Sequence, residues 1–521
     1  MQSLQRHITV GSVIAFLLIA IVSLPVFYVV FSILEYLFTF QINSFDILLN
    51  KRTLILLWRS ICLASSVSLM AALVSLPLAY CFANYLFRFK KVLFTLLLLP
   101  FFIPAYIYAI SWIGITDESG FFNFLDIYGF WGTVFMLVCW LFPVSFLFMI
   151  ASVRKNVRLE EPARLVSGKF RIFRKITMPI ILPGLIAALI SAFIMAITNF
   201  SVAGALRLNV FPTEIFIQFG AFFNHQQAIF LSLPYLILSG ILVYLFFVYS
   251  KKKNINPEQR SEQIELKQLN ISRTLILHFS AIVLLTIVLV IPLISLISGI
   301  GKFKNLLDSV AYSSNEIWQT VLYNALAAIL LTILGFSLAY FRNGIRYSGI
   351  KSMLDFLIVL QIAIPGTIYG IVLTRISQSS GLSSLTSTPL PAVLIADIRY
   401  LPIPYYICMA GLARIPKGYL EASSLIGHPD WMMMRKIIFP LIRNSIFGSL
   451  IIMFVLCFGE LDSAIMVYPP GFETISLRIY SLLHYGASEM VNALSVIQVF
   501  MILILYFSTF RWIHKSIPYH A

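Results

Sequence analysis

Long apolar runs dominate this chain, and short polar stretches separate them. Runs of roughly 18 or more residues, the length that a helix needs to cross the hydrocarbon core of a bilayer, recur twelve times. Six lie in the first half, at 8–34, 60–86, 92–114, 129–153, 177–206 and 228–249. Six lie in the second half, at 274–301, 321–341, 353–374, 390–413, 438–467 and 490–510. The pattern predicts an all-α membrane protein with about twelve transmembrane helices.

The second half repeats short motifs of the first at an interval of about half the chain. Leu78-Ala79-Tyr80 recurs as Leu338-Ala339-Tyr340, and Ile103-Pro104 recurs as Ile364-Pro365. Because each half has an even number of spans, the two halves enter the membrane in the same direction and form parallel repeats. We therefore expect a first repeat at 1–250, a charged cytoplasmic linker at 251–273 and a second repeat at 274–521.

Four prolines lie inside predicted spans, at Pro104, Pro143, Pro365 and Pro402. Each frees a backbone carbonyl that neighbouring helices or water in a cavity must satisfy. Broken helices favour a transport pathway between the halves, although any one of these prolines could equally mark a tolerated kink.

Composition narrows the class of protein. Of the 521 residues, 60% are hydrophobic and 11% are charged, and the mean hydropathy is +0.93, which excludes a soluble globular protein. The run at 8–34 is longer than a signal-peptide core, so it predicts a retained first helix. The five cysteines lie singly in apolar runs, without metal-ligand or redox spacing, and are interpreted as packing residues.

The net charge of +16 is explained by the way in which the chain is predicted to cross the membrane. Most of the 37 Lys and Arg residues fall on one side of the predicted membrane. This positive-inside bias predicts a multi-pass protein in membrane lipid, with both termini and the linker in the cytoplasm. It gives no reason to expect nucleic acid as a partner.

Two polar segments stand at equivalent places in the halves, at 158–180 and 418–441. The second contains Glu421, Ala422 and Gly427, followed by a basic run that ends at Pro440. The first contains Glu161, Ala163, Ser167 and Gly168, followed by a basic run that ends at Pro179. Gly427 can adopt positive φ at little steric cost, which suits a turn between two short helices. The alternative interpretation is a pair of ordinary basic loops.

These segments resemble the cytoplasmic EAA loop of ABC importer permeases, which is here present twice. The first copy departs from the family pattern, because Pro162 replaces an Ala and Ser167 stands where Gly is expected. The resemblance implies a bacterial inner-membrane importer whose loops dock on a separate ATPase subunit, expected as a homodimer, which uses the ATP. It also implies a periplasmic or lipid-anchored substrate-binding protein and alternating access of the pathway. No cofactor bound by this chain itself is expected.

Other residues resemble the fused permeases of ferric-iron ABC importers. They are Pro212-Thr213-Glu214-Ile215 in the first half, and in the second half Gly459-Glu460-Leu461-Asp462, Tyr468 to Ile475 and Arg478 to Gly486. The implied substrate is ferric iron. Thiamine, phosphonate and polyamine permeases share the architecture and remain alternatives.

Ionisable groups inside the spans are candidate pathway or gate residues, since charges in a membrane are costly. They are Asp397, Arg399, Glu460 and Asp462, and Asn199 stands at the place in the first half that corresponds to Glu460. Carboxylate and tyrosine oxygens suit a hard cation. The competing interpretation, a gate or an interface hydrogen bond, is slightly favoured.

The sequence lacks the Gly-x-x-x-x-Gly-Lys-Ser/Thr loop of ATP-hydrolysing proteins, and no nucleophile with a base is evident. The chain is therefore expected to be a transport subunit and no enzyme. A twelve-span secondary transporter also has two parallel halves, but it gives no reason for the duplicated polar segments. A membrane scaffold that transports nothing would not explain the interior acids.

Overall fold

The structure is a computed structural model. The residues that it describes are 27–28, 30–31, 34–35, 49–117, 120, 122–153, 168–252, 267–268, 271–345, 347–366, 368–370, 372–373, 388–425, 430–469, 471–486 and 488–516. Most of the first predicted span and most of the linker at 251–273 lie outside them.

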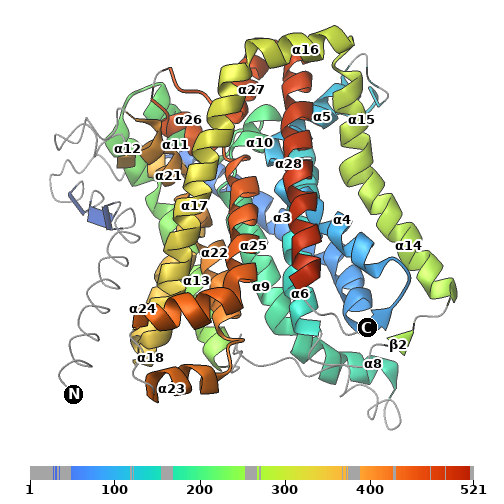
Figure 1. Cartoon of the computed structure of the whole chain (residues 1–521). Helices are drawn as coiled ribbons and strands as arrows, with labels where there is room; N and C mark the ends of the chain where they lie inside the picture. The colour runs from blue at the N-terminus through green and yellow to red at the C-terminus, as the bar shows by residue number, and fades with distance from the viewer. Residues whose placement is uncertain are drawn as a thin grey trace.

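The described part of the chain is almost entirely helical (Figure 1). The first half contains α3 (Lys51–Asn84), α4 (Lys90–Phe102), α5 (Ala105–Thr116), α6 (Phe130–Val153), α8 (Lys169–Ile172), η1 (Phe173–Thr177), α9 (Met178–Ile197), α10 (Ser201–Ala205), α11 (Phe211–Gly220), α12 (His225–Leu231) and α13 (Leu233–Lys252). Strand β1 (Tyr85–Leu86) pairs in parallel with β2 (Lys267–Gln268).

The second half continues the same pattern. It contains α14 (Ile271–Leu285), η2 (Thr286–Val290), α15 (Ile291–Ser298), α16 (Phe303–Tyr312), α17 (Ser314–Gly344), α18 (Ser348–Ala363), α21 (Pro389–Asp397), η3 (Ile398–Tyr400), α22 (Pro402–Leu412), α23 (Lys417–Leu425), α24 (Asp430–Met433), η4 (Met434–Ile438), α25 (Phe439–Cys457), α26 (Ala464–Val467), α27 (Ile475–His484) and α28 (Ser488–Ser516).

Within the described residues, seven helices are long and apolar enough to cross a membrane, and two bent pairs bring the number to nine. The prediction of an all-α membrane protein is confirmed. The pair α4 and α5 bends by 91° at Pro104, and the pair that ends in α22 bends by 60° at Pro402. Pro365 follows the end of α18, whereas Pro143 lies inside the single span α6. Two of the four prolines therefore mark sharply broken spans.

The apolar runs at 177–206 and 438–467 do not form single helices. In the first, α9 ends at Ile197 and the short helix α10 follows; in the second, α25 ends at Cys457 and the short helix α26 follows. Glu460 therefore lies in a break between helices, whereas the sequence pattern had placed it within a span. An apolar run indicates that its residues are buried, but its composition does not show where a helix ends inside the protein.

A π-helical turn precedes a proline at three places. The turn η1 ends two residues before Pro179, η4 ends two residues before Pro440, and η2 ends two residues before Pro292. Proline has no N–H to donate, and its ring collides with the carbonyl four residues earlier in a regular helix. Widening the turn relieves that collision. Two of these turns stand at equivalent places in the halves.

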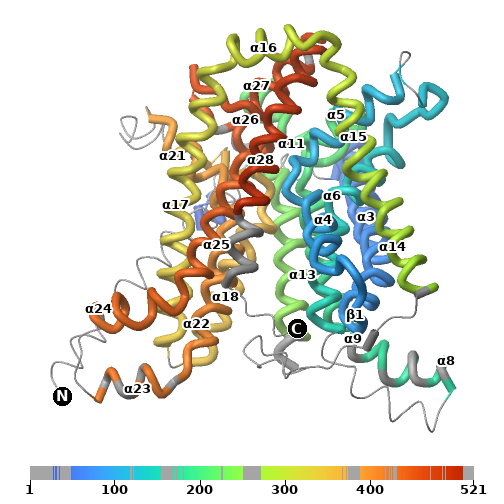
Figure 2. Tube along the Cα trace, turned by 45° about the vertical axis from the view of Figure 1, so that its right-hand side comes forward, coloured from blue at the N-terminus to red at the C-terminus, as the bar shows by residue number. Residues whose placement is uncertain are grey.

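The two halves interlock. The first described span of the second half packs on the first half, where Ser295 Oγ donates to the carbonyl of Ser111 at 2.6 Å. The helix α13 packs on α18, and Tyr506 of α28 donates to the carbonyl of Thr95 at 2.7 Å. Figure 2 shows α13 and α28 running between the halves. One hydrophobic core therefore contains residues from both halves.

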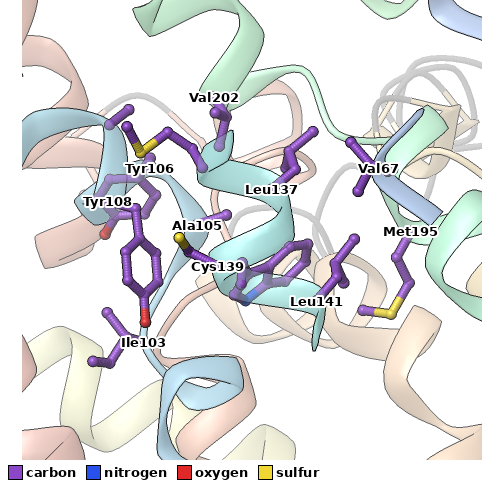
Figure 3. Packing of buried hydrophobic residues seen from close by; sticks show 14 of the residues in the cluster. Val67, Ile103, Ala105, Tyr106, Tyr108, Leu137, Cys139, Leu141, Met195 and Val202 are labelled. Carbon is purple, nitrogen blue, oxygen red and sulfur yellow. The ribbon is translucent and has the colours of Figure 1, made fainter. Parts of the chain in front are cut away.

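The apolar core beside the Pro104 bend is tightly packed (Figure 3). Tyr108 of α5 lies beside Cys139 of α6, and Tyr106 and Leu137 belong to the same core. Cys139 is buried, which agrees with the expected packing role. This core holds α5 in place, so that its first turn faces the second half.

Candidate functional site: a buried ionic cluster at a helix break

Glu460 is the centre of a buried polar cluster in the break between α25 and α26. Its Oε1 accepts hydrogen bonds from the backbone N–H of Ser463 at 2.9 Å and from the Ser463 hydroxyl at 2.8 Å. Its Oε2 accepts a hydrogen bond from the hydroxyl of Tyr400 at 2.7 Å. The carboxylate therefore caps the start of α26 and ties it to η3.

Arg399 supplies the positive charge of the cluster. Its Nη1 lies 3.5 Å from Glu460 Oε1 and 3.9 Å from Asp462 Oδ2, and all three side chains are almost fully buried. Removing charges from water is expensive, and this cost is recovered only where partners are close. The sequence placed Arg399 in one predicted span and Glu460 and Asp462 in the next, and the structure brings the three side chains together.

Asp397 lies beside this group without joining it. It is 1% exposed, and neither of its carboxylate oxygens has a hydrogen-bond partner among the described residues. The Cys457 thiol, Glu460 and Arg399 are its polar neighbours. With Asp397 counted, one guanidinium stands among three buried carboxylates, so this region is formally short of positive charge.

Two glycines allow the backbone to approach the cluster. A Cβ on Gly366 would lie 2.3 Å from Ser463 Oγ and 3.1 Å from Arg399 Nη1. A Cβ on Gly459 would lie 3.0 Å from Pro104 Cγ, at the bend between α4 and α5 of the other half. The cluster therefore lies where the broken helices of both halves meet.

The first half has the same break with different chemistry. Asn199 Oδ1 accepts from the N–H of Val202 at 3.2 Å, which matches the bond from Ser463 to Glu460. Trp140 stands at the place of Arg399, and its indole N–H donates to the carbonyl of Phe101 at 3.0 Å. The helix break is therefore duplicated, whereas the ionic cluster is confined to the second half.

A second polar network, which the sequence did not indicate, supports the break from the outside. Tyr106 donates to Gln498 Oε1 at 2.7 Å, and the Gln498 amide donates to the carbonyl of Phe458 at 2.7 Å. Ser476 donates to the same carbonyl at 2.9 Å. Tyr106 belongs to the first half, so this network also joins the halves. The sequence feature that could have indicated this network is Gln498, a polar residue within the apolar run at 490–510.

Arg342 and Asp355 form another buried pair that sequence reasoning missed. The guanidinium donates from Nε at 3.1 Å and from Nη2 at 2.9 Å to the two carboxylate oxygens, and the hydroxyl of Tyr405 also donates to Asp355. The pair joins α17, α18 and α22. Both charges stand at or near the ends of their apolar runs at 321–341 and 353–374.

The polar segments at 158–180 and 418–441, which are predicted to dock on an ATPase, are called the coupling segments here. Their described parts lie at the same end of the molecule (Figure 1). In the second half, α23 and α24 lead through η4 into α25; in the first half, α8 leads through η1 into α9. Both views place α8 on one side and α23 with α24 on the other (Figure 2).

Not all residues of the predicted coupling segments are described. Glu421 is exposed on α23, Ala422 lies in the same helix, and Gly168 is exposed just before α8. Glu161, Ala163, Ser167 and Gly427 lie outside the described residues. Of the helix–turn–helix expected around Gly427, the structure therefore describes the two helices, α23 and α24.

Within the described residues, no group of three or more His, Cys, Asp or Glu side chains is arranged to hold a metal ion. In the cluster, Tyr400, Ser463 and Arg399 already occupy both oxygens of Glu460. The arrangement joins broken helices, and it favours the gate or interface interpretation over that of a metal ligand.

Comparison with known proteins identifies relatives over part or most of this chain. A putative ferric transport system permease of Haemophilus influenzae is 23% identical over 71% of this chain and 60% of its own length. An Fe(3+)-transport system permease of the same organism is 22% identical over 88% of this chain and 89% of its own length. A putative 2-aminoethylphosphonate transport system permease of Salmonella paratyphi A is 26% identical over 40% of this chain and 76% of its own length.

The family model of binding-protein-dependent transport system inner membrane components matches residues 293–517. The match contains α23, α24 and α25 and the whole ionic cluster. Residues 293–517 are therefore similar to binding-protein-dependent transport system inner membrane components.

Proposed function

We propose that this chain is the permease of a binding-protein-dependent ABC importer for ferric iron. The observation that carries the proposal is the repeated geometry at one end of the molecule. There, α8 with η1 and α24 with η4 present the same succession of short helix, π-helical turn and proline-started long helix. Two equivalent docking elements suit a pair of identical ATPase subunits.

The exposed side chains of these elements support a docking role. Tyr419, Leu425 and Trp431 are large apolar residues exposed on or beside α23 and α24, and Arg435 and Lys436 are exposed on η4. Aromatic anchors with a basic rim are common at protein interfaces. In the proposal, the ATPase subunits bind and hydrolyse ATP, and this chain has no cofactor of its own.

The proposed architecture has twelve transmembrane helices in two parallel six-helix repeats, at 1–250 and 274–521, joined by the linker at 251–273. Equivalent hydrogen bonds support it. Ser60 Oγ accepts from the first backbone N–H of α11 at 2.9 Å, and Thr320 Oγ1 accepts from the first N–H of α27 at 2.8 Å. Tyr108 and Tyr369 each donate to a carbonyl eight residues earlier.

One continuous helix would transmit a movement of the second coupling segment to the cluster, because η4 continues into α25 and α25 ends at the Glu460 break. In the proposed alternating-access cycle, closure of the ATPase pair moves α25 relative to α9. The contact between Gly459 and Pro104 lies between the halves, where the pathway would open.

The chain is proposed to lie in the bacterial inner membrane, with the coupling segments and both termini in the cytoplasm. A periplasmic or lipid-anchored binding protein would deliver the substrate at the opposite end. The basic residues exposed near the coupling segments support this orientation.

A phosphonate is the second candidate substrate. The relative named for 2-aminoethylphosphonate transport is matched over 76% of its own length, although over 40% of this chain. Ferric iron is favoured because a relative named for Fe(3+) transport is matched over 89% of its length.

The test is ATP-driven uptake in vesicles that contain this chain with its ATPase subunit. Iron-loaded binding protein should start uptake of labelled iron, and binding protein loaded with 2-aminoethylphosphonate should not. Uptake of the phosphonate with no uptake of iron would reject the iron assignment and retain the importer assignment. Failure of any ATPase to co-purify with the chain would reject both.

A further inference from the structure

The short helix α16 lies across the end of the molecule opposite the coupling segments (Figures 1 and 2). It connects α15 to α17, and the helices at 272–298 and 314–344 on either side are both apolar enough to span a membrane. Its ends are therefore fixed at the level where two spans leave the bilayer.

The polar face of α16 is turned toward the protein. Asn305 Nδ2 donates to Glu489 Oε2 at 2.6 Å and to the carbonyl of Ile300 at 2.9 Å, and Ser309 is buried. An open pocket of about 440 Å³ lies beside this face, lined by Asn305, Asp308, Ser309 and Tyr312 of α16 and by residues 486 and 488–490 at the start of α28.

The turn before α16 fixes the helix in this orientation. A Cβ on Gly299 would lie 2.2 Å from Asn492 Nδ2 of α28, so the backbone packs directly on that helix. Gly301 has φ of +71°, a conformation that other residues rarely adopt. The glycines therefore allow the polar face of α16 to meet α28.

The apolar face of α16 points away from the protein. Phe303, Leu307 and Val310 are 72%, 56% and 41% exposed, and their spacing places them on one side of the helix. A helix on a protein surface in water has the reverse arrangement, with its apolar stripe against the core. The orientation of α16 is that of a helix whose apolar face meets lipid.

The neighbouring spans continue the same apolar surface. Ile294 and Ile297 of α15 are exposed before α16, and Trp318 is exposed in the first turns of α17. Lys302 and Lys304 are exposed at the start of α16. Long basic side chains extend to lipid headgroups while the helix beside them lies in the apolar region.

We propose that α16 is an interfacial helix that inserts Phe303, Leu307 and Val310 into the acyl-chain boundary of the leaflet opposite the coupling segments. Lys302 and Lys304 contact the phosphates of that leaflet. The helix thereby anchors the start of α28 at a fixed depth, because Asn305 and Gly299 hold it to Glu489 and Asn492. This inference does not depend on the identity of the substrate.

The test places a nitroxide label at Leu307→Cys in the full chain, reconstituted in vesicles of phosphatidylethanolamine and phosphatidylglycerol. Collision with oxygen, which concentrates in lipid, is compared with collision with a water-soluble nickel complex. Lys304→Cys is the matched control on the same helix, and Ile333→Cys is a lipid-facing reference on α17. Labelling of the parent chain gives the background from the native cysteines.

The ratio of oxygen to nickel collisions at Leu307 should exceed that at Lys304 several-fold and lie below that at Ile333, which is deeper in the bilayer. A ratio at Leu307 as low as that at Lys304 would place the face in water and overturn the proposal. Exclusion of both reagents from Leu307 would show that protein covers the face, which also overturns it. Equal melting temperatures of labelled and parent chains ensure that the comparison concerns folded protein.

Discussion

Asn199 and Glu460 occupy equivalent breaks in the two halves, and each accepts a hydrogen bond from the backbone N–H three residues later. Capping alone needs only a neutral acceptor, which Asn199 provides. The negative charge of Glu460 is therefore needed for its additional contacts with Arg399 and Tyr400, and Asn199 makes no equivalent contacts among the described residues. In the second half, ionic contacts of Arg399 hold the broken helices together. In the first half, Trp140 stands at the place of Arg399 and donates a hydrogen bond to a backbone carbonyl.

Replacing Glu460 by Gln is the first test of this difference. The amide oxygen can still cap α26, but Arg399 loses its closest negative partner, and removing one member of a buried ion pair typically costs about 3–5 kcal/mol. We expect a lower melting temperature of the purified chain and a larger loss of uptake than Asp397→Asn causes. Asn199→Gln is the control in the first half. An unchanged melting temperature and uptake rate in Glu460→Gln would contradict the proposed role of the charge.

Replacing Gly366 by Ala should disrupt the cluster through size alone. The new methyl group would overlap Ser463 Oγ and press on Arg399 Nη1. Overpacking of this kind costs about 1–3 kcal/mol. Gly349→Ala in α18 is the control, because nothing lies within 4 Å of its Cβ position and alanine favours a helix. Thermal unfolding should separate the two variants, and equal stability would show that the Gly366 contact can relax.

Replacing Trp431 by Ala should weaken binding of the ATPase subunit without affecting folding. Trp431 is exposed on α24, so its loss removes an aromatic anchor and leaves no cavity. Trp131 is similarly exposed at the start of α6, and Trp131→Ala is the matched control. Co-purification should fall several-fold for Trp431→Ala alone. Equal retention of the ATPase by both variants would exclude Trp431 from the docking surface.

Glu421 and Gly427 belong to the same coupling segment. Glu421→Ala, and more severely Gly427→Pro, should abolish transport and leave insertion into the membrane intact, whereas Ser167→Ala should be tolerated. ATP-driven uptake measured at equal amounts of inserted protein checks this. Equal losses for Ser167→Ala and Gly427→Pro would remove the proposed difference between the two segments.

The linker at 251–273 provides a test of topology. Cysteines introduced at Asn254 and Asn256 should resist membrane-impermeant thiol reagents in intact cells, because the surrounding lysines favour the cytoplasm. The reagents should label both positions after the membrane is opened. Rapid labelling in intact cells would reverse the orientation proposed here.

The sequence by itself determined the class of protein, an all-α membrane protein, and indicated where most of the described spans lie. Long apolar runs can be stable only as helices in lipid, and their repetition indicated a duplicated chain. The four prolines in the runs predicted broken spans for a local reason, the loss of a backbone donor, and the structure has a sharp bend at Pro104 and Pro402, whereas α6 continues through Pro143. The basic runs before Pro179 and Pro440 likewise marked the equivalent segments.

Only the tertiary structure decided how the candidate residues meet. Arg399 and Glu460 lie in runs that are distant in sequence, and Tyr400, Ser463 and Gly366 carried no signal because single Tyr, Ser and Gly residues are common in apolar helices. The ends of α9 and α25 were also hidden, since an apolar run has the same composition whether its backbone is helical or capped by a buried side chain. Contacts between distant segments depend on packing and on the satisfaction of buried polar groups, which local patterns do not encode.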